Sequence, residues 1–282
     1  MYSIVCSEKD SAGMLMKKKF LENFGFKKTE EEFDGNVVYK KENFRLVTIK
    51  EDQVYADCLN ELETELIVFA SKHASAKGPK TFTAHAPGNW GKAELGGKER
   101  SLCPTYASLI KNYLCSMQEK RAERKLEHLV SVEQTHHGPC LEKPAVFIEM
   151  GSNEDHWTDE KAAEVICETI LEKTVLGGDY RTAIGIGGTH YNSEFTKLLL
   201  RTNYALSHMC PEYALENLDE EMLGLAVANT KEKVECLMID YKGIGSGELK
   251  QRIKKLVEGF SEEYGIELLR VRKVLEETKK SQ

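Results

Sequence analysis

Hydrophobic and polar positions alternate along the chain in two different patterns. Short runs rich in aliphatic and β-branched residues recur through most of its length, and stretches with apolar residues three and four positions apart lie between them. The runs of strand type are YSIVC (2–6), FRLVTI (44–49), ELIVFA (65–70), TFTAHA (81–86), LVSVEQT (129–135), AVFIEM (145–150), TAIGIGG (182–188), CLMIDY (236–241) and IELLRV (266–271). Their alternation with helical stretches predicts α/β layers.

The clearest predicted helix spans residues 104–125, with Pro104 in its first turn. Its apolar positions recur at helical spacing, and the opposite face is polar. These positions are Tyr106, Leu109, Ile110, Tyr113, Leu114 and Met117. A second helix is predicted over 158–173, because Thr158 and the two acidic residues after it suit a helix start. Further helices are predicted over 10–23, 192–200, 218–229 and 246–261.

Several strand runs are almost continuously apolar, as strands covered on both faces are. We therefore expect a three-layer sandwich with a mostly parallel or mixed central sheet. The sequence contains no internal repeat and no Pro/Ser-rich linker. These features predict a single α/β catalytic domain over 1–273, followed by a Lys-rich tail over 274–282 that frays.

The composition is that of a folded, soluble protein, with 282 residues, 41% of them hydrophobic and 30% charged. No apolar stretch approaches the roughly 20 residues that cross a bilayer. The start MYSIVCSEKD lacks the features of a signal peptide. We therefore expect a cytoplasmic protein without membrane contact, and a monomer. The eight cysteines form no C-x-x-C pair and are interpreted as reduced core residues.

The net charge of −7 argues against a surface coated in positive charge, although a local basic patch can still bind phosphate. Each basic cluster in the sequence is better explained as a solvated helix face. The clusters lie within 17–19, 120–125, 252–255 and 270–273. The charge therefore leaves binding to RNA open.

Five of the eight histidines stand at or just after the ends of predicted strands. They are His73, His85, His136, His137 and His190, and Glu149 ends another predicted strand. Side chains at the carboxyl ends of strands converge on the crevices where α/β proteins bind ligands. Each histidine alone is as readily structural, but their joint placement beside glycine and proline favours a metal or acid–base site. The remaining three are interpreted as surface or capping histidines, namely His128, His156 and His208.

Imidazole and carboxylate are ligands that zinc takes in proteins, and a catalytic zinc keeps one position for water. The expected zinc ligands are His73, His85, His137, Glu149 and His190. The expected catalytic residues are Glu149, His136 and His137. One ion needs three protein ligands and two need about six, so the residues leave the number of ions open. Metal-free catalysis, with His136 or His137 in acid–base roles, is the alternative.

Two glycines are candidates for holding a phosphate or an oxyanion. GIGGTHY (185–191) follows a predicted strand and precedes a predicted helix. Backbone amides in such a turn face an anion in many proteins, so the amides of Gly187 and Gly188 are the candidates here. In the alternative, these glycines only permit tight packing and an unusual turn. The segment lacks a complete nucleotide-binding pattern, so no nucleotide cofactor is predicted.

The loop 85–100 is interpreted as facing the substrate. It carries Trp90 beside Lys92, a pairing that suits stacking on a nucleobase and neutralising a phosphate. In the alternative, Trp90 packs the loop onto the core. Asp240 and Lys242 end another strand, ahead of a helix with Ser246 as its expected cap, and are expected to line the same crevice.

Together, these loops make the chain resemble the archaeal-type D-aminoacyl-tRNA deacylases, whose relatives also occur in plants. The resemblance rests on ENFGFKKTEEEFDGNVVYK (22–40), KHAS (72–75), HAPGNWGKAELGG (85–97), THHGP (135–139), FIEMGS (147–152), GIGGTHY (185–191) and IDYKG (239–243). It implies hydrolysis of the ester between a D-amino acid and the tRNA 3′ end, with broad tolerance of the amino acid. It also implies two zinc ions per subunit and a phosphorylase/hydrolase-like α/β fold. Thr189 and Ala74 depart from the family pattern, and neither removes a candidate ligand.

The expected mechanism is attack of zinc-activated water on the ester carbonyl, with Glu149 or a neighbouring histidine as the base. Zinc or the glycine-loop amides would stabilise the oxyanion, and the ribose hydroxyl would leave. One rival interpretation is a zinc aminopeptidase or amidohydrolase, which uses the same side chains on peptide bonds. Another is a non-catalytic tRNA-binding protein, against which the acidic charge weighs.

Overall fold

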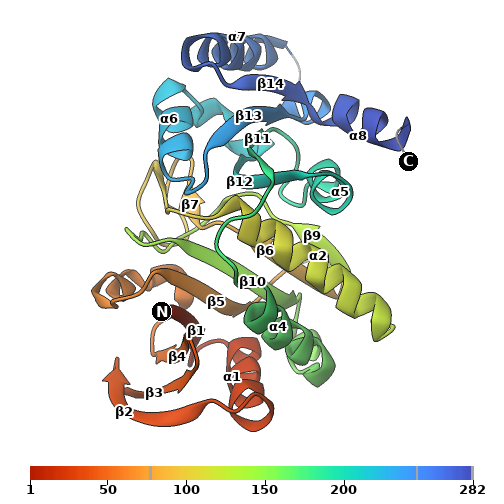
Figure 1. Ribbon diagram of the computed structural model, residues 1–282. Coiled ribbons are helices and arrows are strands. Elements are labelled where there is room, and N and C mark those ends of the chain that lie inside the picture. Colours follow the sequence, from red (N-terminus) through yellow and green to blue (C-terminus); the bar gives the residue numbers. More distant parts are fainter. Residues whose placement is uncertain (76–77, 246, 281–282) are drawn as a thin grey trace.

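A computed structural model describes residues 1–75, 78–245 and 247–280, in which strands form two main sheets (Figure 1). The larger sheet is mixed. Its strands, in order across the sheet, are β2 (Lys27–Phe33), β3 (Asn36–Lys41), β4 (Phe44–Ile49), β1 (Tyr2–Ser7), β5 (Leu66–Lys72), β10 (Ala145–Gly151), β6 (Thr81–His85) and β9 (Leu129–Val132). The smaller sheet is parallel and consists of β12 (Tyr204–Cys210), β11 (Arg181–Ile186), β13 (Val234–Ile239) and β14 (Glu267–Arg270).

Helices cover both sheets. Those packed against one face of the larger sheet are α1 (Ser11–Asn23), α2 (Ala107–Glu123) and α4 (Glu160–Lys173). Those packed around the smaller sheet are α5 (Ser193–Arg201), α6 (Glu220–Ala228), α7 (Gly247–Tyr264) and α8 (Val271–Lys280). The remaining elements are short, namely α3 (Glu154–Trp157), β7 (Gly88–Asn89), β8 (Ser101–Leu102) and the 3-10 turns η1 (Gln53–Tyr55), η2 (Asp57–Glu61), η3 (Glu212–Asn217) and η4 (Tyr241–Ile244). The predicted α/β class with a mixed sheet is confirmed.

One hydrophobic cluster joins the two sheets. It contains Ile148 of β10, Leu114 of α2 and Leu206 of β12, all fully buried. Helix α2 packs against β6 of the larger sheet and β12 of the smaller one, so it bridges them. The tertiary structure thus divides the predicted central sheet into two sheets that share a core.

The second face of the larger sheet carries 3-10 turns rather than long helices. Leu59 of η2 packs there against Ile67 of β5 and Phe147 of β10. Short turns leave part of this face open to loops that arrive from elsewhere in the chain. This is the face on which the candidate site lies.

Local sequence explains where the helices begin. The Asp10 carboxylate accepts a hydrogen bond from the Gly13 amide at 2.9 Å and caps α1. Asn192 caps α5 by accepting from the amides of Glu194 and Phe195, as the sequence predicts. Helix α4 is capped by Asp159, one residue after the expected position. The expected cap Ser246 of α7 lies outside the described residues.

The hairpin of β2 and β3 is an element that the sequence patterns do not predict. The segment of β2 reads KKTEEEF and is mostly exposed, so it has no apolar alternation. It sits at the edge of the sheet and pairs with β3 through backbone hydrogen bonds. A polar edge strand such as β2 is therefore not predicted from the spacing of hydrophobic residues.

The chain between 274 and 280 differs from the expected fraying tail. It belongs to α8, in which Val271, Val274 and Leu275 are buried against the core. Helix α8 packs against α5 and β14. Burial of three apolar side chains on one helical face holds α8 against the core, although the lysines of this segment suggested a frayed tail.

Two of the three histidines expected at the surface or at helix caps are instead in the core. His128 is 1% exposed and stacks on Phe82 with ring centroids 4.3 Å apart. His208 is fully buried within β12. His156 is half-buried in α3. The charged residues next to His128 in the sequence suggested a surface position. Its burial depends instead on the strand that packs beside it.

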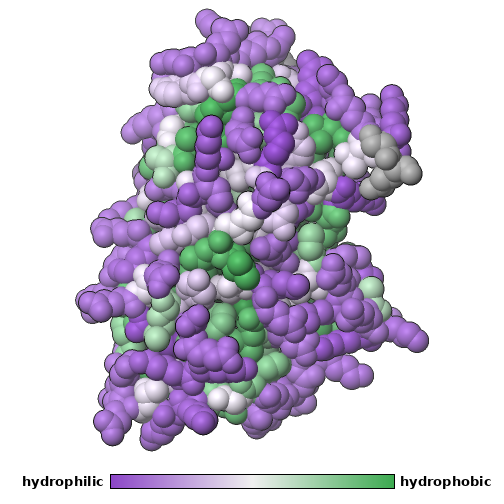
Figure 2. All heavy atoms as spheres, in the orientation of Figure 1, coloured by the Kyte–Doolittle hydropathy of each residue, from purple (hydrophilic) through white to green (hydrophobic). Residues whose placement is uncertain are grey.

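The surface agrees with the expectation from composition, whereas the cysteines agree only in part, because five of the eight are buried, Cys115 and Cys140 are half-buried and Cys58 is exposed. The face drawn in Figure 2 is mostly hydrophilic, with hydrophobic side chains gathered near its middle. Among the described residues, all eight cysteines are free thiols. Within those residues, none of the helices combines the length and the apolar character that crossing a bilayer requires.

Candidate metal-binding active site

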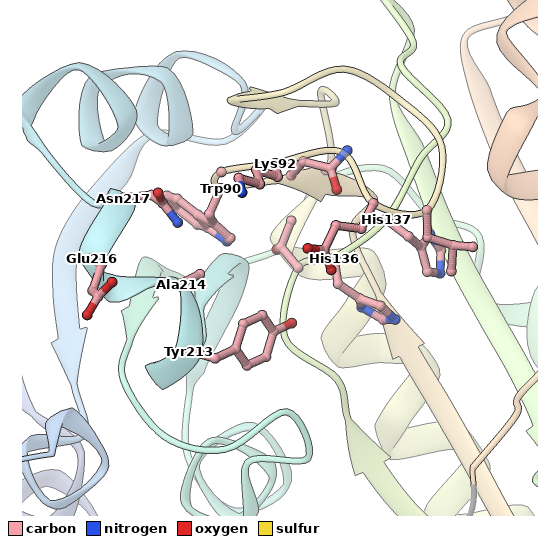
Figure 3. Close-up of a pocket in the computed structure, with 14 residues that line it drawn as sticks. Trp90, Lys92, His136, His137, Tyr213, Ala214, Glu216 and Asn217 are labelled. Carbon is pink, nitrogen blue, oxygen red and sulfur yellow. The ribbon is translucent and has the colours of Figure 1, made fainter.

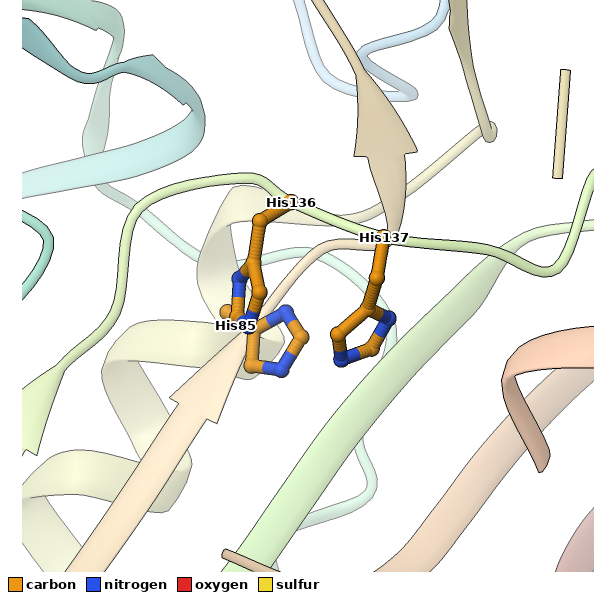
Figure 4. Close-up of side chains that lie close together, drawn as sticks. All are labelled: His85, His136 and His137. Atoms are coloured by element: carbon orange, nitrogen blue, oxygen red, sulfur yellow. The ribbon is translucent and has the colours of Figure 1, made fainter. Parts of the chain in front are cut away.

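Five histidines and two glutamates meet over the open face of the larger sheet. In the described part of the chain their nitrogen and oxygen atoms form three overlapping groups, and within each group these atoms lie within 4.8 Å of one another. The groups are His85, His136 and His137; Glu133, His136 and His190; and His73, Glu133 and Glu149. Figure 4 shows the first of them, with three imidazoles turned toward a common space. All five expected zinc ligands lie in these groups.

Two neighbouring strands form the floor of the site. His85 of β6 pairs with Phe147 of β10, and Glu149 lies two residues further along β10 on the same face. The His85 ring stacks on the Phe147 ring with centroids 5.1 Å apart. Strands β6 and β10 are antiparallel, so the site lies across a sheet face. His73, His85 and Glu133 do stand at the carboxyl ends of β5, β6 and β9, but these strands do not all run in one direction, so the residues do not share one parallel edge.

The segment after β9 forms the roof. Isolated β-bridges pair His136 with Pro87 and Glu133 with Tyr191, which fixes the segment above both sheets. The Gly88 amide donates a hydrogen bond to the His137 carbonyl at 2.8 Å. His137 adopts a left-handed backbone conformation with φ of 46°. Such strain in a residue other than glycine persists where the surroundings enforce it, as they do at many functional sites.

Three of the imidazoles are oriented by the backbone. In His85, His136 and His137 the Nδ1 atom faces a carbonyl oxygen, which can only accept a hydrogen bond. These oxygens, at 3.2, 2.7 and 2.7 Å, belong to Ala86, Gln134 and Gly138. The proton is therefore held on Nδ1, and Nε2 keeps its lone pair. This is the arrangement by which proteins prepare histidine as a metal ligand.

Glu133 is the centre of the cluster. Its carboxylate lies 2.8 Å from His190 Nε2, 3.0 Å from His73 Nδ1 and 3.6 Å from His136 Nε2. The side chain is 1% exposed. The sequence reading omitted Glu133, although an acidic residue three positions before His136 at the end of an apolar run was a visible signal.

The pKa values of the two buried carboxyl groups shift in opposite directions. Burial opposes ionisation of Glu133, but hydrogen bonds from His190 and His73 outweigh it and hold its pKa well below the usual range. Burial raises the pKa of Glu149 to about 7. His73 lies between the two, with Nδ1 3.4 Å from Glu149 Oε2. Burial lowers the pKa of His73, but both carboxylates raise it to about 10.

The imidazoles on the other side stay neutral. Burial lowers the pKa of His85 to about 3, and it lowers the pKa of His136 and His137 as well. Neutral imidazole is the form that binds metal. A site with neutral imidazoles beside buried carboxylates carries both ligand types that zinc takes.

The residues present fit a divalent metal. His85 Nε2 is fully buried, and no hydrogen bond to it is found among the described residues. Glu133 and Glu149 are both less than 5% exposed, and buried carboxylates are costly unless cations neutralise them. A cation bound between them would accept the unpaired imidazole lone pair and neutralise the buried carboxylates. Nitrogen and oxygen donors together suit zinc among other divalent ions.

Two cavities adjoin the cluster. The first has a volume of about 330 Å³ and is lined by the residues of the cluster other than His85, together with Asp52 and Gln53. The second, about 440 Å³, is lined by the loop from Gly88 and by η3 (Figure 3). Leu95, His136 and His137 line both, so the cavities meet at this histidine pair.

Of the expected substrate-binding residues, Trp90 and Lys92 lie at the second cavity. Lys92 is exposed on its wall. Trp90 is only 2% exposed, and its indole nitrogen donates a hydrogen bond to the Met209 carbonyl at 3.0 Å. It packs the loop onto the core and presents no open ring face for a base. The expectation of stacking on Trp90 is therefore wrong.

The glycine motif is structural. The Gly187 amide donates to the Cys210 carbonyl, and the Gly188 amide donates to the Gly243 carbonyl. A Cβ at Gly188 would lie 1.9 Å from Asn192 Nδ2, so a side chain cannot fit there. The expectation that these amides hold a phosphate or an oxyanion is wrong, because their hydrogens are already bonded within the fold.

Asp240 and Lys242 lie apart from the cluster. Asp240 is 7% exposed, and its carboxylate faces Gly188 and Gly243. Lys242 is exposed in η4. Neither residue lines the two cavities next to the histidines. The strand end that carries them belongs to the smaller sheet, whose carboxyl edge is filled by η3 and η4.

Comparison with known proteins gives a consistent result. A family model described as D-aminoacyl-tRNA deacylase matches residues 60–269. D-aminoacyl-tRNA deacylases of Pyrococcus furiosus and Thermococcus onnurineus are 38% and 39% identical, and each match covers 95% of this chain and 98% of the relative. The crystal structure of a conserved protein of unknown function, AF0625, superposes with a TM-score of 0.87 at 37% identity, over 97% of this chain and 96% of that one.

Proposed function

The chain belongs to the D-aminoacyl-tRNA deacylase family, and on that premise we propose that it hydrolyses the ester between a D-amino acid and the 3′ end of tRNA with a zinc-activated water. The products are free tRNA and the free D-amino acid. The observation that carries the mechanism is the convergence of five histidines and two glutamates in one buried cluster. The relatives match over nearly the whole chain, which supports the activity, and the cluster of potential ligands is the site that we propose for it.

The residues that would hold zinc form two sets within the cluster. One set consists of His85, His136 and His137. The other consists of His73, Glu133, Glu149 and His190, and its Glu133 also lies 3.6 Å from His136 of the first set. Two ions per subunit match this inventory, because each ion needs at least three protein ligands. Bound zinc supplies a Lewis acid that polarises a carbonyl and makes water a stronger nucleophile at neutral pH.

Glu149 is the proposed general base. Its Oε2 atom accepts a hydrogen bond from Thr83 Oγ1 at 3.3 Å and lies 3.9 Å from His85 Nε2, on the floor of the cavity. A carboxylate held there takes a proton from the attacking water and returns it to the ribose oxygen that leaves. Tyr191 donates to or accepts from His73 Nε2 at 3.0 Å and fixes that ring. The chain's own groups thereby orient the water and carry its proton.

Hydrolysis of matched substrates tests the proposal. Zinc-loaded protein is expected to release tyrosine from D-tyrosyl-tRNA and to leave L-tyrosyl-tRNA intact. Cleavage of aminoacyl-p-nitroanilides without action on D-tyrosyl-tRNA would establish the peptidase interpretation instead. Binding of tRNA that weakens with salt, with no release of amino acid at any zinc concentration, would establish a non-catalytic RNA-binding protein.

A further inference from the structure

The second cavity belongs to the same site but differs in chemistry from the cavity that holds the ligand cluster. The walls of the first cavity include Glu133, Glu149 and His73, which are buried ionisable groups. The second cavity shares only His136 and His137 with the cluster. Its other walls include loop backbone and aromatic, polar and apolar side chains, together with three charged ones, namely Lys92, Glu94 and Glu216. A substrate with two unlike halves joined by a scissile bond requires two such spaces that meet at the reacting groups.

Tyr213 is the aromatic side chain of the second cavity that is open to solvent. It is 64% exposed, whereas Trp90 in the opposite wall is 2% exposed. Figure 3 shows its ring projecting from η3 on the side toward His136. The Tyr213 and His190 rings are nearly parallel, with centroids 6.5 Å apart and an interplanar angle of 24°. A flat ring is thus presented between the cavity and the cluster.

The turn that carries Tyr213 is held in place from three sides. The Glu212 amide donates to the Gly188 carbonyl at 2.8 Å, which ties η3 to the glycine motif. Arg252 donates to the Leu218 carbonyl at 2.9 Å just after the turn. Arg100 donates to the Asn217 carbonyl at 3.0 Å. A ring on a backbone fixed in this way loses little freedom when a ligand stacks on it.

We propose that the second cavity receives the 3′-terminal nucleoside of the substrate, with its base stacked on Tyr213, while the first cavity receives the aminoacyl group. This assignment rests on the proposed function. The ester then lies at His136 and His137, which line both cavities. Lys92 lies on the wall of the second cavity, where its charge would neutralise the phosphate that joins this nucleoside to the preceding one. An aromatic ring beside a cation is how proteins grip the end of a single strand.

The assignment also explains the glycine motif. Its amides bind no ligand, but the Gly188 carbonyl positions the turn that presents Tyr213. The motif therefore acts on the substrate through η3. Tyr213 is a substrate-binding residue, since it contacts the nucleoside and takes no part in proton transfer.

Steady-state kinetics of zinc-loaded variants on D-tyrosyl-tRNA test the nucleoside site. Tyr213→Ala is expected to raise KM about tenfold with kcat within about twofold, the order of one lost base–aromatic stack. Tyr213→Phe keeps the ring and is expected to behave as wild type. Tyr264→Ala, at a tyrosine 53% exposed on α7, is the matched control. An unchanged KM for Tyr213→Ala, or a loss confined to kcat, overturns the inference.

Binding of adenosine monophosphate separates this inference from the proposed function, because it needs no turnover. Calorimetry is expected to show binding to the wild type and to Tyr213→Phe, and binding at least tenfold weaker to Tyr213→Ala. A wild type that binds the nucleotide but hydrolyses no aminoacyl-tRNA would end the proposed function and leave the nucleoside site standing. A wild type that hydrolyses D-tyrosyl-tRNA while Tyr213→Ala binds the nucleotide equally well would end the nucleoside site alone.

Discussion

His190 Nε2 lies 2.8 Å from Glu133 Oε2, although the two residues are 57 positions apart in the chain. The contact joins the loop after β11 in the smaller sheet to the segment after β9 in the larger sheet. The two sheets thus meet at the candidate site as well as in the hydrophobic core. Glu133 connects the groups of potential ligands on either side of it, which makes this pair a sensitive place to test the site.

Replacement of Glu133 by glutamine is expected to reduce deacylation by roughly two orders of magnitude or more, because it removes a charged ligand at the centre of the cluster. Metal analysis should show less zinc per chain than in the wild type. Glu99→Gln, at an exposed loop residue, serves as the control. Full activity and full zinc content in Glu133→Gln would exclude Glu133 from the metal site.

His137→Ala and His190→Ala are each expected to abolish deacylation with little change in the melting temperature. Each removes an imidazole of the cluster, and both side chains are only half-buried, so the core loses little packing. The control is His156→Ala, since His156 is a half-buried histidine outside the three groups. If both variants keep wild-type activity, these histidines are packing residues rather than ligands.

Removal of metal should inactivate the enzyme reversibly. Dialysis against a chelator is expected to abolish hydrolysis of D-tyrosyl-tRNA, and added zinc should restore it. The buried carboxylates also predict a lower melting temperature for the dialysed protein, because bound metal stabilises only the folded state. Purified active protein with less than about one zinc per chain would favour metal-free acid–base catalysis.

His208 should make the protein sensitive to acid. Burial lowers its pKa from 6.5 to about 4, so the unfolded state binds the proton first as the pH falls. The contribution of His208 to the unfolding free energy is fully present above pH 6.5 and is lost as the pH falls toward 4, by roughly 3 kcal/mol in total. His208→Leu should therefore show a weaker pH dependence of the unfolding free energy than the wild type. Equal pH dependence in both proteins would show that His208 is not buried as a neutral ring.

The docking of α8 is tested by a truncated side chain. Leu275 is 7% exposed in the shared core, so Leu275→Ala should lower the unfolding free energy by about 2–3 kcal/mol. The neighbouring Glu276→Ala changes an exposed residue and is expected to have little effect. Chemical denaturation compares the two. Indistinguishable midpoints would mean that the end of the chain contributes nothing to the fold.

Much of the fold could be predicted because the spacing of hydrophobic residues along the chain depends on local secondary structure. The run in β10 and the helical spacing in α2 each depend on burial of one continuous stretch, which the sequence records directly. The β2–β3 hairpin and the docking of α8 were missed. Both depend on which neighbour covers a largely polar segment, and that information is not local.

The sequence predicted the residue types of the candidate site, but it identified only some of the residues that form it. Histidines at strand ends pointed to metal chemistry, and the structure brings all five together. Tyr213 was missed, since a tyrosine in a loop is common and carries no spacing signal. Glu133 was missed although it stands three positions before His136 at the end of an apolar run. Trp90 was chosen for its position beside Lys92, although its burial depends on the segments that the loop packs against.

The sequence by itself indicated most of the elements, most of the candidate ligand residues and, through its motifs, the family. The tertiary structure alone decided that the residues meet across a sheet face, that Glu133 is their centre, and that the glycine motif supports a turn instead of binding an anion. The physical reason is the range of the interactions. Hydrophobic period and capping act within a few residues, whereas metal-ligand geometry and burial depend on segments that approach only when two sheets pack on one core.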